Sequence, residues 1–596
     1  AVLLDKSLIR RQVDGRFELH ALICMYATEK LAEDPAEVTQ TQARHRAYFA
    51  RMLEEAVTQW RVTNSAASLA TIRSEADNLL AGWHWELEQA DWDEAATYLD
   101  NLWQFLKLQR RLTEAIELLE QALRTGKAAE PETRLLYQAH WQRLLGEAYL
   151  WLSQFEEGDA HFKQVVHLLN RPLPASRVGL LLGFLKQLVI QGLHRLTPGA
   201  FVGRQAYKQA AIKEAFIAYE RLGSRAAVEN DSLLAVFCFF QALNMAEATG
   251  LPRLMARAYA FVGLIFGLIP LRRVAGAYLA WARALAREEG SLSLQERVFG
   301  LTGIYFAGMG RWQQAVKSCH LAADAARELG QHWDEVVYLV ALLFAAHHQG
   351  QYELALEYAR QVGDTARSSG DAGSEVDALY WEALSRLRQD DIEQAVRLLK
   401  ESAAAPPAVM NRFDWIILRA TLAQAYLRQG KTDLARQEAD KVADLVAQFA
   451  VPTHCFFLDG YAGIAAIYLA LWEEEKEEEN GRAYRSLARR SVRDLRAFAR
   501  AFPVAAPQAW LQQGRYKWLD GKERKAFKAW QKSLACAEDL GMPFEQGLAH
   551  YEIGRHLSAG ESTEEGWGGR QHLQRACEIF SDLGTTYDLD RARAEL

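Results

Sequence analysis

Small and turn-forming residues recur along the middle of the chain at a step of forty residues. One position is alanine in six successive units: Ala235, Ala275, Ala315, Ala355, Ala395 and Ala435. A second position is small in five of the six units: Gly223, Gly263, Gly303, Leu343, Ala383 and Ala423. A third holds residues that end helices or form turns: Asn230, Pro270, Gly310, Gly350, Asp390 and Gly430. The pattern predicts antiparallel helix pairs that pack closely where only a small side chain fits.

The order of residues within one unit is equally regular. Gly303, Phe306, Gly310, Trp312 and Ala315 follow one another as small, aromatic, turn, aromatic and small residue. This order resembles the tetratricopeptide repeat, and the resemblance implies an all-α, right-handed solenoid of helix hairpins. Because the step is forty residues and not about 34, we expect extra residues to lengthen the helices or the loop between units.

The first residues follow a different pattern. Residues 8–13 and 16–19 are expected to form a hairpin around Asp14-Gly15, and a helix is expected from His20 to about Glu33. The string from Lys6 to Leu31 resembles the end of the winged-helix domain in bacterial signal-transducing ATPases with numerous domains. Arg44-His45, Tyr48-Phe49 and Asp77-Asn78-Leu79 resemble the helical linker of the same class.

Residues 205–596 resemble the tetratricopeptide half of large bacterial ATPases. The strings that carry this resemblance include Ala218-Tyr219-Glu220-Arg221-Leu222 and Leu540-Gly541-Met542-Pro543. The resemblance implies a sensor that restrains or releases an ATPase, although no ATPase lies within these residues. Since the chain begins at Ala1 without Met, we expect it to be a fragment of a longer protein.

Five segments are expected. They are a winged-helix remnant (1–35), a helical linker (36–95), irregular repeats (96–204), regular forty-residue repeats (205–450) and C-terminal repeats (451–596). The acidic run from Glu473 to Glu479 breaks the step, which predicts a solvated insertion or a helix extension.

Composition narrows the class of protein. Half of the 596 residues are apolar, and the net charge of −7 gives no general attraction to nucleic acid or anionic membranes. We expect no membrane-spanning segment, because charged or polar residues interrupt every apolar run. No signal peptide opens the chain. Six cysteines lie far apart, which favours buried thiols in a reducing compartment and predicts a cytoplasmic protein.

No pattern in the sequence indicates catalysis, a metal or a cofactor. Gly430-Lys431-Thr432 lacks the upstream glycine of a phosphate loop, since that position is Ala425 within a predicted helix. His347-His348 are adjacent on a helix and point about 100° apart, with no third ligand nearby. We therefore expect neither an enzyme nor a cofactor site.

A binding groove is the expected functional site. In resembling repeats the first helix of each pair lines the concave face, and most positions transferred from them are apolar. They are Arg257, Arg297, Ile304, Val337, Val340, Phe344, His347, Tyr380, Leu384, Leu387, Ile417, Gln424 and Leu427. From these we select as partner-binding residues Arg257, Arg297, Phe344, His347, Tyr380 and Gln424. Such a lining suits an amphipathic helix or an apolar ligand. The alternative is that neighbouring units or an internal helix bury these side chains.

A second candidate is a row of arginines with helical spacing: Arg482, Arg485, Arg489, Arg493, Arg496 and Arg500. It could bind nucleic acid, phosphate or an acidic protein, or be a solvated face paired with the acidic run. The expected function is a sensor module of a signalling ATPase that binds a protein, a peptide or a small molecule. The alternatives are a free-standing scaffold and, less in keeping with the net charge, a nucleic-acid-binding repeat.

Overall fold

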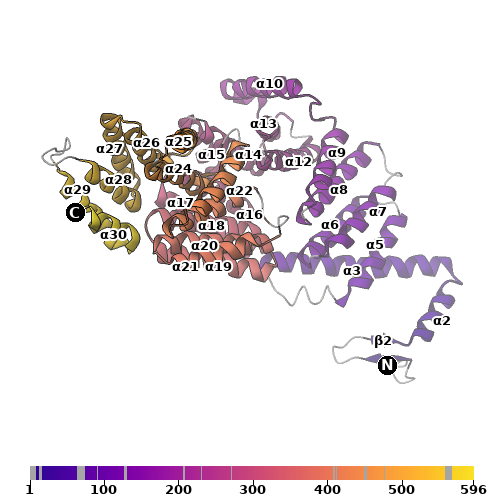
Figure 1. The fold of residues 1–596 in the computed structure, drawn as a ribbon. Coiled ribbons are helices and arrows are strands. Elements are labelled where there is room, and N and C mark those ends of the chain that lie inside the picture. The colour runs from indigo at the N-terminus through magenta and orange to yellow at the C-terminus, as the bar shows by residue number, and fades with distance from the viewer. Residues whose placement is uncertain are drawn as a thin grey trace. The chain divides into compact units, whose positions relative to one another are not determined.

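The chain divides into two compact units, Ala1–Leu173 and Pro174–Leu596, and each is described by itself (Figure 1). The computed structural model describes residues 8–11, 17–63, 74–89, 92–109, 111–125, 131–152, 154–205, 208–229, 231–269, 271–406, 410, 412–448, 452, 454–475, 477–557 and 567–596. The division falls after Leu173, whereas the sequence suggested a change at 204/205. Residues 174–204 thus group with the regular repeats.

The first unit begins with the expected hairpin and helix. Strands β1 (Ile9–Arg11) and β2 (Phe17–Leu19) pair antiparallel, with Ile9 opposite Leu19. The Asp14-Gly15 turn lies outside the described residues. Helix α2 (Ala21–Leu31) follows, capped by His20. These elements confirm the local prediction, but they do not show a winged-helix domain.

The rest of the first unit is helical. Its helices are α3 (Pro35–Thr63), α5 (Ala76–Gln89), α6 (Trp92–Leu108), α7 (Leu112–Thr125), α8 (Pro131–Trp151) and α9 (Phe155–Leu168). Consecutive helices pack on one another, as in a hairpin repeat. A Cβ added at Gly146 of α8 would lie only 2.8 Å from the Phe162 ring of α9, so this pair also packs around a small residue.

The second unit continues the series of helix pairs. Its helices up to residue 403 are α10 (Arg177–Leu196), α11 (Pro198–Phe201), α12 (Gln209–Val228), α13 (Ser232–Thr249), α14 (Pro252–Leu268), α15 (Arg272–Glu289), α16 (Leu292–Gly308), α17 (Trp312–Glu328), α18 (His332–His348), α19 (Tyr352–Ser369), α20 (Ala372–Arg388) and α21 (Ile392–Ala403). Those that follow are α22 (Arg412–Arg428), α23 (Thr432–Ala447), η3 (Cys455–Phe457), α24 (Leu458–Glu474), α25 (Glu478–Ala501), η4 (Pro503–Ala505), α26 (Ala506–Leu519), α27 (Glu523–Leu540), α28 (Pro543–His556), α29 (Gly569–Leu583) and α30 (Thr586–Ala594). Contacts are denser within the pairs α14/α15 and α16/α17 than between these pairs, whereas α19 contacts α18 and α20 equally. The sequential packing of antiparallel helices agrees with the predicted hairpins.

Turns occur at half the expected repeat, every twenty residues. Gly310, Gly350, Asp390 and Gly430 take the left-handed backbone, with φ between 66° and 73°. A second series that the sequence reading missed, Gly250, Gly290, Gly330 and Gly370, takes it between hairpins, with φ of 67° to 69°. Helices α16 to α20 therefore have 17 or 18 residues each. The longer step thus comes from longer helices and not from longer loops.

The small positions lie where the two helices of a hairpin touch. A Cβ on Gly303 of α16 would lie 2.4 Å from the sulfur of Cys319 on α17. On Gly263 it would lie 2.7 Å from Leu279. Both distances are shorter than real side chains allow, which confirms that glycine is needed there for close packing.

Hairpins far apart in sequence also meet within the second unit. The indole nitrogen of Trp312 donates a hydrogen bond to the Leu540 carbonyl at 2.6 Å, and Arg272 donates to the Arg500 carbonyl at 3.3 Å. Arg428 pairs with Asp588 at 3.3 Å. The C-terminal hairpins thus fold back on the middle ones, which the sequence did not indicate.

Two expectations from composition need correction. Helix α13 and residues Cys455–Glu474 are long and apolar enough to cross a membrane, although 67% and 83% of their apolar windows are buried inside the fold. Such burial is usual for core helices of a soluble fold. Cys238, Cys319 and Cys455 are buried thiols as expected, but Cys24 is exposed, and Cys536 and Cys577 are half-buried.

Candidate functional site

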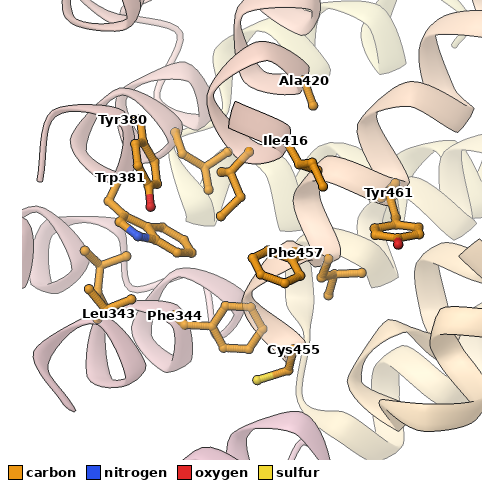
Figure 2. Packing of buried hydrophobic residues seen from close by; sticks show 14 of the residues in the cluster. Leu343, Phe344, Tyr380, Trp381, Ile416, Ala420, Cys455, Phe457 and Tyr461 are labelled. Atoms are coloured by element: carbon orange, nitrogen blue, oxygen red, sulfur yellow. The ribbon is translucent and has the colours of Figure 1, made fainter. Parts of the chain in front are cut away.

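Phe344 and Tyr380 lie in the core of the second unit and not in an open groove. They are 0% and 3% exposed. The Phe344 ring contacts Phe456, at 5.3 Å between centroids, and Phe456 belongs to the segment just before α24. Figure 2 shows Phe344, Trp381, Cys455 and Phe457 together in this cluster. The chain's own segment covers the expected groove positions here, which is the alternative that the sequence left open.

His347 is also an interior residue. Burial lowers the pKa of its imidazole to about 3, so the ring is neutral, and its Nδ1 lies 3.3 Å from the Ser385 hydroxyl. The adjacent His348 lies 3.4 Å from Asp459 and 4.0 Å from Glu545. The two histidines therefore join helices α18, α20, α24 and α28. Among the residues that the structure describes, no group of three His, Cys, Asp or Glu side chains is arranged so that it could hold a metal ion.

Arg257 and Arg297 form ion pairs between neighbouring helices. Arg257 pairs with Glu220 at 2.7 Å, and Arg297 pairs with Asp334 at 3.1 Å. Burial opposes the charge of Arg297, but Asp334 and Glu296 outweigh it and raise the pKa of the guanidinium. Each of these arginines therefore already has a carboxylate partner on a neighbouring helix. Gln424 is half-buried, with its amide nitrogen against Gly463.

These ion pairs are part of a line of polar side chains that crosses the first helices of successive hairpins. We call it the polar row; its members are Glu220, Arg257, Glu296, Arg297, Asp334, Tyr338, Tyr380 and Asp414. Tyr338 donates to Glu296, which is 1% exposed, and burial raises the pKa of Glu296 to about 7. Further along, the Tyr380 hydroxyl lies 3.4 Å from Asp414. Sequence reasoning missed this row, although opposite charges spaced 37 residues apart (Glu220 and Arg257, Arg297 and Asp334) were a usable signal.

Helix α10 exposes apolar side chains along its whole length. Successive members are one, three or four residues apart: Val178, Leu181, Leu182, Leu185, Val189, Leu193 and Leu196. Val178, Leu182, Val189 and Leu196 are each more than 60% exposed. The sequence placed this segment among the irregular repeats of residues 96–204 and predicted no binding surface there.

The face by which α10 packs on α13 is largely polar. Gln191 donates to Glu247 at 2.9 Å, and His194 lies 2.7 Å from the same carboxylate. Gln187 accepts from Asn244 at 2.8 Å. All five side chains are buried. The helix thus buries its polar face and exposes its apolar one, the reverse of an ordinary surface helix.

The six arginines of the α25 row are all exposed, as the spacing predicted. Arg485 pairs with Asp520, while Arg496 lies 5.0 Å from the Trp510 ring. Within the acidic run, Glu473 pairs with Arg515 and Arg555 of α26 and α28, at 3.0 and 2.8 Å. That part of the run therefore joins neighbouring hairpins and is not merely solvated.

The helix pairs, their turns and their close-packed small residues define a tetratricopeptide-like helical repeat protein.

No protein-family model and no curated protein matches the sequence. Among solved structures, the apo form of the quorum sensor NprR from B. thuringiensis is similar at 14% identity, covering 62% of this chain and 99% of that one, with a TM-score of 0.37. Yeast Tom70 is similar at 12% identity, covering 86% and 98%, with a TM-score of 0.26. Human IFIT1, a dimer with m7Gppp-AAAA, matches at 12% identity, covering 78% and 95%, with a TM-score of 0.27. Scores this low do not indicate what this chain binds.

Proposed function

We propose that this chain is a binding module, not an enzyme, and that a protein partner docks on the exposed face of α10. The observation that carries this is the inversion of the helix: seven apolar side chains face outward, while glutamines and a histidine face the core. Each Å² of exposed apolar surface costs about 25 cal/mol in water. Contiguous apolar patches of this kind mark interaction surfaces on soluble proteins.

The charges on α10 favour a partner with carboxylates. The helix contains Arg177, Lys186 and Arg195 and neither aspartate nor glutamate. Because Arg195 pairs with Glu247 of α13, Arg177 and Lys186 are the charges offered to a partner. A second copy docking antiparallel would bring Lys186 close to its equivalent, and like charges in an interface oppose association. The occupant that fits is therefore an amphipathic helix of another protein, with leucines on one face and glutamates beside them.

A synthetic helix tests this docking surface directly. The probe is a peptide with leucine at the a and d positions of its heptads and glutamate at e and g; a second peptide carries lysine at e and g. We expect the acidic peptide to bind the full chain, and the double variant L182Q/V189Q to weaken binding at least tenfold. The matched control is L321Q/L434Q, which changes two isolated exposed leucines elsewhere in the unit.

Three results would reject the proposed surface. They are equal binding of both peptides, no effect of L182Q/V189Q, and an equal loss in the control variant. Size-exclusion chromatography with light scattering can give a fourth result that rejects the proposed partner. If the unmodified chain is a dimer that L182Q/V189Q dissociates, the occupant is a second copy.

The finer role, regulation of an ATPase in the same polypeptide within the cytoplasm, rests on the resemblance described above. One feature supports it: α2 exposes Leu22, Met25 and Tyr26, each more than 60% accessible, as a helix would that packs on a further domain. The parent gene tests this role. A phosphate-loop motif encoded upstream, and an ATPase rate of the parent protein that changes in L182Q/V189Q, are expected. Their absence would leave the free-standing scaffold.

A further inference from the structure

A pocket of about 270 Å³ lies where α15, α16 and the start of α17 meet in the second unit. Its wall is built from four arginines, two aromatic residues and three others. The lining residues are Arg272, Arg273, Gly276, Leu279, Arg283, Tyr305, Phe306, Arg311 and Gln314. There is no carboxylate among them. No residue of α10 lines the pocket, but the pocket adjoins the end of the α25 arginine row, because Arg272 donates to the Arg500 carbonyl.

The four guanidiniums carry charge that the protein does not neutralise. Within the part of the chain that the structure describes, none of them forms an ion pair with Asp or Glu. Among the described residues, Arg272 donates to the Arg500 carbonyl and Arg283 to the Leu279 carbonyl, each at 3.3 Å. By contrast, Arg257 and Arg297 on the neighbouring α14 and α16 are both paired with carboxylates.

The pKa of Arg283 is in keeping with the lack of a carboxylate partner. Burial, and then the neighbouring Arg287, lower the pKa of its guanidinium, and no carboxylate raises it. Four cations around one small pocket repel one another, so an anion that enters gains attraction from all of them.

The pocket is also partly preorganised. The Arg283 guanidinium lies 5.3 Å from the centre of the Phe306 ring, and stacking of this kind holds the planar group in one orientation. Tyr305 and Phe306 are 7% and 4% exposed and so form a firm wall. A fixed guanidinium fork loses little freedom when it binds two oxygens of one group.

We infer that this pocket binds a small molecule with two linked phosphate groups. Guanidinium forks match phosphate oxygens in bidentate pairs, and four of them suit more charge than one carboxylate supplies. A volume of about 270 Å³ is close to the lower end of small-molecule sites, and Arg272, Arg273 and Arg311 are exposed to an incoming anion. This inference does not rest on the docking surface at α10.

Inorganic pyrophosphate is the simplest probe. By titration calorimetry on the full chain at low ionic strength, we expect one site, with affinity that falls as salt rises. The double variant R283Q/R311Q should weaken binding at least tenfold. R283K/R311K, which keeps the charge but removes the forks, should also weaken it. Lys431→Gln, in the Gly430-Lys431-Thr432 turn, should leave it unchanged.

Other ligands separate specific binding from general attraction. Inorganic phosphate should bind more weakly than pyrophosphate, and citrate, with three carboxylates, at least tenfold more weakly. The inference is overturned if pyrophosphate shows no binding at millimolar concentration or if R283Q/R311Q binds as tightly as the unmodified chain. It is also overturned if citrate binds equally well, or if only single-stranded RNA binds and depends on Arg489 and Arg493. Unchanged circular dichroism and melting temperature of R283Q/R311Q show that the variant is folded.

Discussion

Single glycines decide how closely neighbouring helices approach in this fold. Gly300 of α16 faces Tyr338 of α18, and an added Cβ would lie 2.1 Å from the tyrosine ring. The ring cannot easily move aside, because its hydroxyl donates to buried Glu296. A side chain at position 300 would therefore disturb both the packing of α16 on α18 and the hydrogen bond between Tyr338 and Glu296.

Gly300→Ala is therefore expected to destabilise the second unit by about 1–3 kcal/mol, the usual cost of overpacking a core. The matched control is Gly481→Ala in α25, where an added Cβ meets nothing within 4 Å. That change should stabilise by about 0.4–1 kcal/mol, because alanine favours the helix. Urea unfolding measures both; a Gly300→Ala variant as stable as the control would contradict the packing described here.

Glu296 gives the second unit a pH dependence of known sign. Burial raises the pKa of this carboxyl from about 4.5 to about 7 in the folded chain, so the folded state holds the proton more tightly than the unfolded one. Its contribution to stability is complete below about pH 4.5 and is lost as pH rises toward 7. Glu296→Gln should remove this dependence, and near pH 7.5 we expect it to stabilise by on the order of 1–3 kcal/mol. Melting temperatures at pH 5 and 7.5 compare the two proteins. A parallel decline in both would assign the pH dependence to other groups.

At the scale of elements, the turn between α17 and α18 depends on backbone conformation alone. Gly330 joins α17 to α18 at φ 67°, and an added Cβ there would meet nothing within 4 Å. Strain in the left-handed region is thus the whole cost of a side chain. Gly330→Ala should destabilise by about 1–2 kcal/mol, and Gly330→Asn by less, since asparagine tolerates this region. Thermal melts of the two variants check the order, and equal effects would point to a steric cause.

The helix pairs could be predicted because their constraints are local and repeated. Ala315 and Ala355 are buried where two adjacent helices meet, and that requirement recurs at every unit. The orientation of α10 was not predicted, because many leucines and no acidic residue do not indicate which face of the helix is buried. The arginine-lined pocket could not be predicted from the sequence. Arg272 and Arg311 lie on different hairpins and come together through the packing of α15 on α16 and α17.

The covering of the groove could not be predicted from the residue pattern of single repeats. Transfer of positions from known repeats placed Phe344 and Tyr380 on the inner face, but Phe456 belongs to an irregular segment without a repeat position. Whether such a segment fills the inner face depends on the curvature accumulated over several hairpins. No residue pattern within one unit encodes that quantity.

At the scale of the whole second unit, contacts between distant hairpins predict cooperative behaviour. His348 and Arg388 of α18 and α20 meet residues of α28: His348 lies 4.0 Å from Glu545, and Arg388 lies over the Phe544 ring at 4.1 Å. Destabilising α28 should therefore loosen α18 and α20 as well, unlike in an open solenoid whose repeats sense only their neighbours.

Gly554→Ala tests this coupling, because its Cβ would lie 2.7 Å from Leu573 in the α28/α29 pair. We expect hydrogen exchange to accelerate in α18 and α20 as well as in α26–α30. Acceleration that is confined to α26–α30 would mean that the unit behaves as a linear array.

The contacts between distant hairpins also limit how the gene can gain or lose repeats. Trp312 and Leu540 are separated by 228 residues, and so are Arg272 and Arg500. Duplication or loss of one hairpin between them would shift every later partner by forty positions and leave Trp312 facing a different helix. Open repeat arrays drift in copy number between species through such events. In this unit we therefore expect the number of hairpins between those partners to stay constant, and variation to arise by substitution within hairpins and not by gain or loss of whole ones.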